Sequence, residues 1–259
     1  MNITTTGYET KSATDTRSQN VVLVHGAWQG AWIWDAVSAA LRMRGHRVHT
    51  LDLPGSGSDT TPAGEVTLSS YAQRITDAIK AIGAPVTLVG HSMGGMAVAA
   101  AAELVPEQLT QLIYLCAFLP LDGDSLGALS ALDDSKAPLR TELAPGNAAA
   151  RLHQDDVASR LLHDCDPAVA AWAATQFRPQ PLQPLGTPIQ LSEARYGRVA
   201  RSYVVCTEDR AVSPALQRRM LERSPCRRVL ELPTGHLPFL ADPWRVGQGI
   251  HELMQDLPR

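Results

Sequence analysis

Short runs of hydrophobic and β-branched residues alternate with amphipathic segments along most of the chain. The runs are a few residues long and mostly apolar, as expected for strands that are buried on both faces of a sheet. Six of them lie at about residues 21–24, 48–53, 86–90, 112–118, 202–207 and 228–232. This alternation predicts an α/β fold in which a mainly parallel six-stranded sheet is flanked by helices.

The segments between these runs have the spacing and the end signals of helices. Tyr71, Ile75 and Ile79 recur every four positions, so they lie on one face of a helix. Thr67 is a helix-capping residue before this segment, and Gly83 is a helix-ending residue after it. A helix is therefore predicted between Thr67 and Gly83, directly before the run at 86–90.

Residues 120–196 do not follow the alternation. They contain many prolines and two helical stretches, at about 156–163 and 168–177, but no strand-helix repeat. An insertion between parallel strands leaves the sheet at its carboxyl edge, where the binding sites of such sheets lie. We therefore expect 120–196 to be a cap over a core formed by 20–119 and 197–259, and not a surface loop without a role.

Composition restricts the classes of partner. The 259 residues carry a formal charge of −3 and are 44% hydrophobic, which is ordinary for one globular domain and not basic enough to suggest nucleic acid. No run approaches the roughly 18 apolar residues of a membrane span. Residues 1–19 lack the apolar centre of a signal peptide, so we expect a flexible tail and a cytoplasmic protein. The four cysteines are widely spaced and are expected to be reduced thiols.

A serine stands where one predicted strand turns into a helix. The segment Gly90–Gly94 reads Gly-His-Ser-Met-Gly and directly follows the strand-like run at 86–90. Glycines on both sides of Ser92 permit a sharp turn that exposes its hydroxyl at the edge of the sheet. Serine alone is a weak nucleophile, so a histidine and a carboxylate must activate it.

Two later strand ends supply these partners. Asp209 follows the run at 202–207, and His236 follows the run at 228–232. The order serine, acid, histidine is the one expected when all three stand at the carboxyl edge of one parallel sheet. In this assignment His236 accepts the proton of Ser92, and Asp209 orients the imidazole and stabilises its charged form.

Other acids and histidines compete for these roles. Glu208 adjoins Asp209, and Asp122 and Asp124 follow the fourth run, which is another place for a triad acid. Asp52 is expected to anchor a loop. His46 and His49 form no recognisable metal set, and no metal site is expected. His91 is expected to pack beside the serine turn and His25 to order its own loop. Three further histidines are expected at the surface: His153, His163 and His251.

Two backbone N–H groups are candidates for an oxyanion hole. That of Met93 follows the serine at a helix N-terminus, where negative charge is stabilised. The second donor is expected in the loop after the first strand, and we assign it to Ala27. A backbone donor cannot be removed by mutation, so Gly26 and Ala27 are expected to be sensitive to added bulk instead.

Four segments, at 22–34, 45–53, 90–95 and 207–214, together resemble the branch of the α/β-hydrolase superfamily that holds plant methylesterases, hydroxynitrile lyases and related bacterial carboxylesterases. The Gly-Ala-Trp-x-Trp sequence at 30–34, in the first of these segments, is more diagnostic than the turn around Ser92. The resemblance covers about 20–119 and 200–257, and it implies an α/β-hydrolase fold. The segment between these regions matches poorly, which leaves the substrate open.

Two positions distinguish the activities within that branch. The hydroxynitrile lyases that the chain resembles carry a threonine and a lysine where this sequence has Gly26 and Leu237. Without an ammonium group, a departing cyanide loses electrostatic stabilisation. Ester hydrolysis is therefore preferred, with a lyase or carbon–carbon bond hydrolase and a non-catalytic small-molecule receptor as the alternatives.

The sequence thus predicts a cofactor-independent serine esterase that cleaves a small to medium, largely apolar carboxylic ester. No nucleic-acid or membrane partner is expected, and a homodimer is left open. The candidate pocket residues come from both the core and the expected cap. They are Gly26, Trp28, Leu119, Leu126, Leu129, Leu132, Trp172, Phe177 and Leu237.

Overall fold

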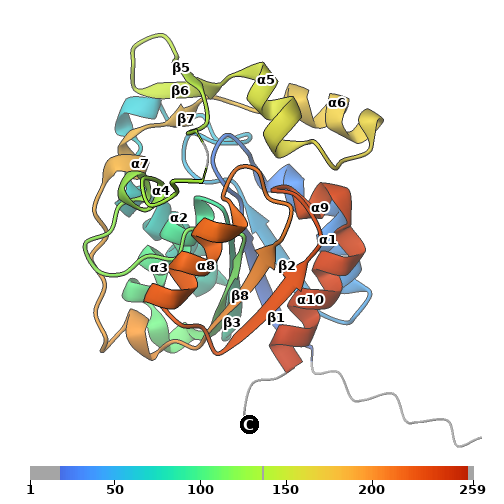
Figure 1. Cartoon of the computed structure of the whole chain (residues 1–259). Coiled ribbons are helices and arrows are strands. Elements are labelled where there is room, and N and C mark those ends of the chain that lie inside the picture. Colours follow the sequence, from blue (N-terminus) through green and yellow to red (C-terminus); the bar gives the residue numbers. More distant parts are fainter. Residues whose placement is uncertain (1–17, 136, 256–259) are drawn as a thin grey trace, which may run out of the picture.

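A parallel six-stranded sheet forms the centre of the molecule in the computed structural model, which describes residues 18–135 and 137–255. The strand order is β2-β1-β3-β4-β8-β9, and every neighbouring pair is parallel. This confirms the sheet that the hydrophobic runs predict (Figure 1). The strands are β1 (Asn20–Val24), β2 (Arg47–Leu51), β3 (Val86–His91), β4 (Leu109–Leu115), β8 (Arg201–Cys206) and β9 (Arg228–Leu232).

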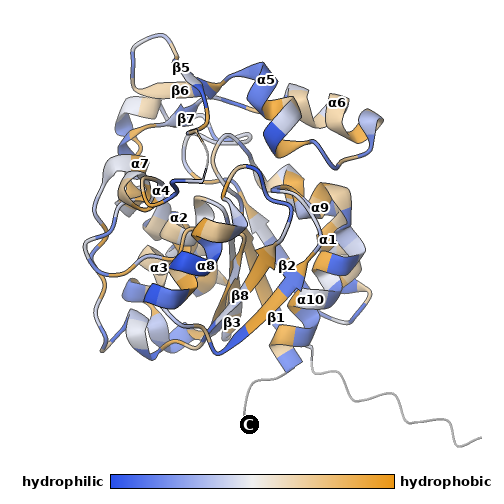
Figure 2. Ribbon diagram, in the orientation of Figure 1, coloured by the Kyte–Doolittle hydropathy of each residue, from blue (hydrophilic) through white to orange (hydrophobic). Residues whose placement is uncertain are grey.

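Helices cover both faces of this sheet (Figure 1). One layer contains α1 (Asp35–Arg42), α9 (Pro238–Ala241) and α10 (Pro243–Gln255), and the other contains α2 (Leu68–Ile82), α3 (Gly94–Leu104) and α8 (Pro214–Arg223). Each layer packs a separate hydrophobic cluster against the strands. Figure 2 shows hydrophobic residues concentrated in the central strands, with hydrophilic residues on the outer side of α8. Short 3-10 turns complete the core at η1 (Ala31–Trp34), η2 (Ala63–Glu65), η3 (Pro106–Gln108) and η5 (Tyr196–Arg198).

Helix α2 begins and ends where the sequence indicates. The Thr67 hydroxyl accepts a hydrogen bond from the Ser70 N–H, and the Ser70 hydroxyl accepts one from the Thr67 N–H. At the other end Gly83 has a φ of 66°, a left-handed conformation that glycine adopts easily. This helix leads directly into β3, the strand that ends just before Ser92.

The fourth strand differs from its predicted range. The run at 112–118 predicts a strand, but β4 covers Leu109–Leu115. The chain turns at Cys116, whose φ is 37°. Residues 116–118 are buried and as hydrophobic as a strand, so hydropathy alone does not reveal this turn.

Residues 120–196 contain short elements that lie above the carboxyl edge of the sheet (Figure 1). The helical stretch predicted at 156–163 is formed by α5 (Gln154–Asp156) and the π-helical turn η4 (Val157–Leu161), and the one at 168–177 by α6 (Pro167–Gln176). The other helices of this region are α4 (Leu126–Ser130) and α7 (Gln183–Gly186).

A small antiparallel sheet in this region was not predicted. Its order is β5-β6-β7, formed by β5 (Thr141–Leu143), β6 (Ala149–Leu152) and β7 (Gln180–Pro181). Strands this short carry no readable alternation, and β7 is separated from β6 by two helical segments. Their pairing therefore depends on tertiary contacts.

The tail predicted at 1–19 lies outside the described residues, except for Ser18 and Gln19. Gln19 is tied to the core, because its carbonyl accepts from the Arg47 N–H at 2.9 Å and its amide donates to the Met254 carbonyl at 3.1 Å. Within the described ranges, no helix has the length and hydrophobicity needed to cross a bilayer.

Candidate active site

Ser92 occupies a strained turn between β3 and α3. Its φ is 52°, which is unusual for a residue with a side chain. Close packing of backbone on either side requires glycine: a Cβ at Gly90 would lie 2.8 Å from the Gly94 carbonyl oxygen, and a Cβ at Gly94 would lie 2.7 Å from the His25 carbonyl oxygen. The sequence Gly-His-Ser-Met-Gly therefore has the local geometry of a nucleophile elbow.

Three side chains from distant parts of the sequence meet at this turn. Ser92 Oγ lies 3.0 Å from His236 Nε2, and His236 Nδ1 lies 2.7 Å from Asp209 Oδ2. All three residues are at least nine-tenths buried. With the His236 Nδ1–H donating to Asp209, Nε2 is free to accept the serine proton.

The Asp209 carboxylate is held by its own loop. Its Oδ1 accepts from the N–H groups of Ala211 at 2.6 Å and Val212 at 2.9 Å, and its Oδ2 accepts from Gln217 Nε2 at 3.3 Å. These donors fix the oxygen that faces His236.

The competing acids lie in other interactions. Asp124 pairs with Arg223 at 3.0 Å, and Asp122 accepts from the Leu191 N–H at 2.8 Å. Glu208 is exposed, and its backbone bonds to the Thr234 carbonyl and to the His163 ring. The geometry thus selects Asp209 as the carboxylate beside His236.

The two predicted oxyanion donors flank the serine. Neither the Ala27 N–H nor the Met93 N–H has a protein acceptor among the described residues, and both residues line the same cavity as Ser92. The Ala27 loop is fixed by Gln29, whose Oε1 accepts from the Gly26 N–H at 3.0 Å. Both donors are thus available at the cavity.

His91 and Cys116 contact the backbone carbonyl group of His236. His91 Nε2 lies 2.8 Å and Cys116 Sγ 3.6 Å from the carbonyl oxygen of His236. Burial, followed by the nearby His236 ring, lowers the pKa of His91 well below its usual value. These three side chains have potential metal-ligating atoms within 4.8 Å of one another, but those atoms already have hydrogen-bond partners in the protein.

His25 and Asp52 hold the loops next to the site. His25 Nδ1–H donates to the Gly26 carbonyl at 2.8 Å, and Nε2 accepts from the Leu53 N–H at 3.1 Å. Burial lowers the pKa of His25. Asp52 accepts from the Ala31 N–H at 2.6 Å and from Ser58. Burial alone would raise the pKa of Asp52, but these hydrogen bonds outweigh it and lower that pKa.

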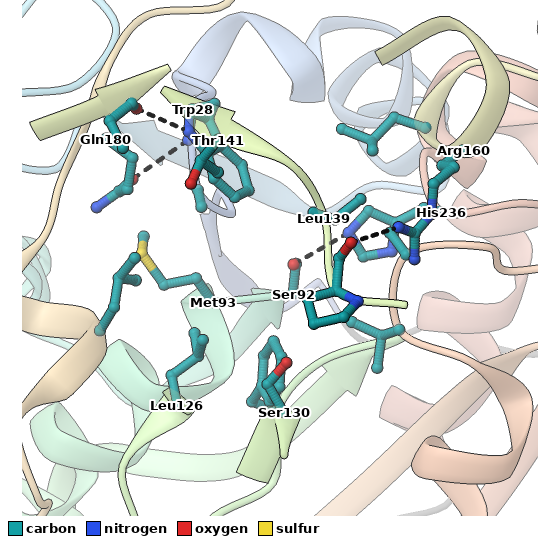
Figure 3. A pocket seen from close by; sticks show the side chains of 18 of the residues that line it. Trp28, Ser92, Met93, Leu126, Ser130, Leu139, Thr141, Arg160, Gln180 and His236 are labelled. Carbon is teal, nitrogen blue, oxygen red and sulfur yellow. Dashed lines mark hydrogen bonds between the residues drawn. The ribbon is translucent and has the colours of Figure 1, made fainter. Parts of the chain in front are cut away.

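A cavity of about 220 Å³ opens above Ser92 and His236 (Figure 3). Of the predicted pocket residues, Trp28 and Leu126 line it. Trp28 is held in place by hydrogen bonds from its backbone N–H to Gln180 Oε1 at 3.2 Å and from its indole to the Ala150 carbonyl at 3.0 Å. Trp28 therefore links the core to residues beyond 120.

The other predicted pocket residues are not among those that line this cavity. Gly26 packs behind Ser92. Trp172 is 47% exposed, and Trp172 and Phe177 pack edge-on against Trp32 at the surface. The remaining four are core residues in the two hydrophobic clusters: Leu119, Leu129, Leu132 and Leu237.

Several lining residues carry no sequence signal. Ser130, Leu139, Thr141, Arg160, Gln180 and Leu182 come from the region between 120 and 196 and face the cavity. Neither periodicity nor a motif distinguishes them from their neighbours. Only the folding of this region over the sheet places them there.

The region above the sheet is fastened to the loops that carry Asp209 and His236. His163 Nε2 lies 3.1 Å from the Glu208 carbonyl, and Asp164 accepts from the Gly235 N–H at 2.6 Å. The Arg210 guanidinium donates to the Ser159 carbonyl at 3.2 Å. These bonds fix the roof of the cavity relative to the two residues.

Comparisons with known proteins place the chain in one family. The model of the alpha/beta hydrolase family matches residues 21–246. Methylesterase 1 of Arabidopsis thaliana is 32% identical over 243 residues, covering 88% of this chain and 92% of its own. A protein of the same plant named "Putative methylesterase 11, chloroplastic" is 31% identical over 258 residues. The alignment covers 95% of this chain, which spans only 65% of that longer protein.

A solved structure agrees with these relatives. The crystal structure of polyneuridine aldehyde esterase has a TM-score of 0.83 and 26% identity, covering 92% of this chain and all of that one. Fold, elbow and relatives therefore converge: the chain belongs to the alpha/beta hydrolase family, in the branch of carboxylic ester hydrolases that holds the plant methylesterases.

Proposed function

We propose that this protein hydrolyses a small to medium carboxylic ester through an acyl-enzyme on Ser92. The observation that carries the proposal is the unbroken series of hydrogen bonds from Ser92 Oγ through His236 to Asp209. The methylesterases and esterases among its relatives support the same reaction class.

In the acylation step, Ser92 Oγ attacks the ester carbonyl carbon while its proton passes to His236 Nε2. The carbonyl oxygen becomes negatively charged and accepts hydrogen bonds from the Ala27 and Met93 N–H groups. Asp209 stabilises the imidazolium. The carbon–oxygen bond to the alcohol then breaks, the alcohol takes the proton from His236, and the acyl group stays on Ser92.

In the deacylation step, water takes the place of the alcohol. His236 accepts a proton from that water, whose oxygen attacks the acyl carbon. Collapse of the second tetrahedral intermediate returns the proton to Ser92 Oγ and releases the carboxylic acid. Besides the ester and this water, the two steps use only groups of the chain: Ser92, His236, Asp209 and the two N–H donors.

The size and lining of the cavity indicate the substrate class. A volume of about 220 Å³ suits a small to medium ester rather than a long acyl chain. Apolar side chains such as Leu126, Leu139 and Leu185 form much of the wall. Residues 120–196 supply most of them, so we assign a cap function to this region.

The replacement Ser92→Ala tests the nucleophile. It removes the attacking oxygen from a buried turn without adding volume. Loss of turnover of a p-nitrophenyl ester, by about a thousandfold or more, is expected together with an unchanged far-UV spectrum. Labelling by a fluorophosphonate should disappear in the same variant.

Ser130→Ala is the matched control. Ser130 lines the same cavity but comes from α4, and His236 bonds instead to Ser92. We expect labelling and turnover to persist in this variant. Near-normal turnover by Ser92→Ala would remove the proposed mechanism.

A further inference from the structure

Arg160 brings a positive charge into a largely apolar cavity. It lies on the π-helical turn η4, in which the Leu162 N–H bonds to the Val157 carbonyl at 3.0 Å. Such turns are frequent at functional sites. Figure 3 shows the Arg160 side chain reaching into the cavity on the side of His236, and both residues line it.

Only part of the guanidinium is satisfied by the protein. Nε donates to the Arg210 carbonyl at 2.9 Å, and Nη1 donates to the Pro138 carbonyl at 3.1 Å, with Asp156 Oδ2 at 3.7 Å. Nη2 is buried and has no acceptor among the described residues. A buried donor on a charged group is costly when left unpaired.

We propose that Arg160 is a specificity-determining residue whose Nη2 donates to an oxygen acceptor of the substrate, separate from the ester that is cleaved. The acceptor is a carbonyl or carboxylate oxygen on either the acyl or the alcohol part. This inference rests on the proposed function and narrows its substrate class. It replaces the largely apolar ester predicted from sequence with an ester that carries one additional polar group.

Carboxylates already lie close to Arg160, so the substrate group that binds Nη2 does not have to be an anion. Asp156 lies 3.7 Å from Nη1 and also pairs with Arg140, while Asp133 contributes a second carboxylate to the cavity lining. A neutral carbonyl oxygen can therefore accept the hydrogen bond from Nη2 with the same geometry as a carboxylate oxygen. The shared requirement is an oxygen lone pair at Nη2.

A purely structural role is the competing explanation. Arg160 Nε joins the π-helical turn to the loop of Asp209, and the Arg210 guanidinium makes a similar connection to the Ser159 carbonyl. Arg210 is therefore a matched control: its replacement weakens the same attachment but removes no charge from the cavity lining. A structural role predicts the same effect on every ester, whereas recognition predicts a selective effect.

The test compares esters of equal length in two series. In the acyl series, the methyl esters are methyl hexanoate, its oxo analogue with a ketone beside the terminal methyl, and monomethyl glutarate. The alcohol series contains three acetate esters. Their alcohol parts are an alkanol, the matching hydroxyketone and the matching hydroxyacid. Values of kcat/KM are measured for the wild type and for Arg160→Met, Arg160→Lys and Arg210→Met.

We expect the wild type to favour an acceptor-bearing ester over the plain one in at least one series. In Arg160→Met this ratio should fall by about tenfold to a hundredfold, which corresponds to one hydrogen bond from a charged donor. Arg160→Lys should keep part of the preference, and Arg210→Met should keep all of it. The response to ketone and carboxylate distinguishes a neutral acceptor from an anionic one.

Two results would overturn the inference while leaving the proposed function intact. One is a wild type that hydrolyses esters without preferring an acceptor in either series. The other is a uniform loss for all esters in Arg160→Met, which would show a structural role. If thermal denaturation shows that Arg160→Met is not folded, the ratio of kcat/KM values in Arg160→Lys is used in its place. A wild type that cleaves no ester and is not labelled at Ser92 would instead refute the proposed function itself.

Discussion

At the scale of single residues, Ser92 shows how a strained conformation is maintained. A positive φ in a residue with a side chain costs about 1–3 kcal/mol, and here it is enforced by backbone contacts that only glycines at 90, 94 and 95 allow. The His25 loop and the turn at Phe118 press against the same corner. The position of the hydroxyl is therefore determined by packing on three sides.

The replacement Gly26→Ala should disturb this corner. Its new methyl group would lie 2.8 Å from both His91 Nδ1 and Ser92 Cβ, so the loop that carries the Ala27 N–H must move. Losing one oxyanion donor raises the activation free energy by about 2.7–4 kcal/mol. We expect kcat, measured with a p-nitrophenyl ester, to fall by no more than the factor that corresponds to this increase.

Gly64→Ala provides the comparison for this variant. A Cβ there meets only Ala148, at 3.9 Å, so activity should stay close to wild type. Equal activity in the two variants would contradict the role assigned to the Gly26 loop.

The replacement Asp209→Asn tests the acid. An amide in this place no longer selects the tautomer of His236 that accepts the serine proton, and kcat should drop by about ten-thousandfold. Asp124→Asn weakens the ion pair with Arg223 and the hydrogen bond from the Leu121 N–H but changes no group that bonds to His236, so kcat should stay within about twofold of wild type. A larger loss in Asp124→Asn than in Asp209→Asn would reverse the assignment.

At the scale of elements, helices α2 and α8 support strands β3 and β8, whose carboxyl ends lead to Ser92 and Asp209. Helix α2 leads into β3, and α8 packs against β8 through Gln217, which bonds to the Cys206 N–H at 3.1 Å and to Asp209. The helix start of α8 is fixed by the Ser213 hydroxyl, which accepts from the Leu216 N–H at 3.0 Å. The N-cap of α8 thus helps to position Asp209 at the carboxyl edge of the sheet.

The capping box of α2 makes a stability prediction. Thr67→Ala removes an N-cap hydrogen bond and should lower the free energy of unfolding by about 1 kcal/mol, measured by urea denaturation, with no change in kcat. Ser69→Ala, at an exposed position of the same helix, should change stability by no more than a few tenths of a kcal/mol. Similar losses in both variants would show that the cap is not the cause.

At the scale of the whole molecule, histidines couple folding to pH. Burial is the main cause that lowers the pKa of His25, His46, His49, His91 and His251. His46 and His251 also form a pair, with 2.8 Å between His46 Nε2 and His251 Nδ1. These rings therefore bind a proton less readily in the folded chain than after unfolding.

The sign of the pH dependence follows from this difference. Below the ordinary histidine value of 6.5, the unfolded chain binds more protons than the folded one, so stability falls as pH decreases. We expect a lower Tm at pH 5.5 than at pH 7.5, chosen here as points about one unit on each side of that value. His251→Gln removes one contributing group and should reduce the difference; a difference that stays the same would show that the pair does not contribute.

Prediction from sequence was most successful where a local signal existed. The Gly-His-Ser-Met-Gly segment, the cap at Thr67 and the six hydrophobic runs were all readable, because each depends on neighbours in the chain. The turn at Cys116 was not, since a buried turn and a buried strand have the same hydropathy. Trp172 and Phe177 were assigned to the pocket because they are large and apolar, yet they pack against Trp32 at the surface.

The sequence by itself determined the parallel sheet, its helical layers and the order of the three residues that meet at its edge, because periodicity and capping act over a few residues. Only the tertiary structure decided which side chains face the cavity. The region between 120 and 196 consists of short elements whose pairing depends on contacts far apart in the chain. That is why Arg160, which has no motif around it, became visible as a candidate for substrate recognition only after the chain was folded.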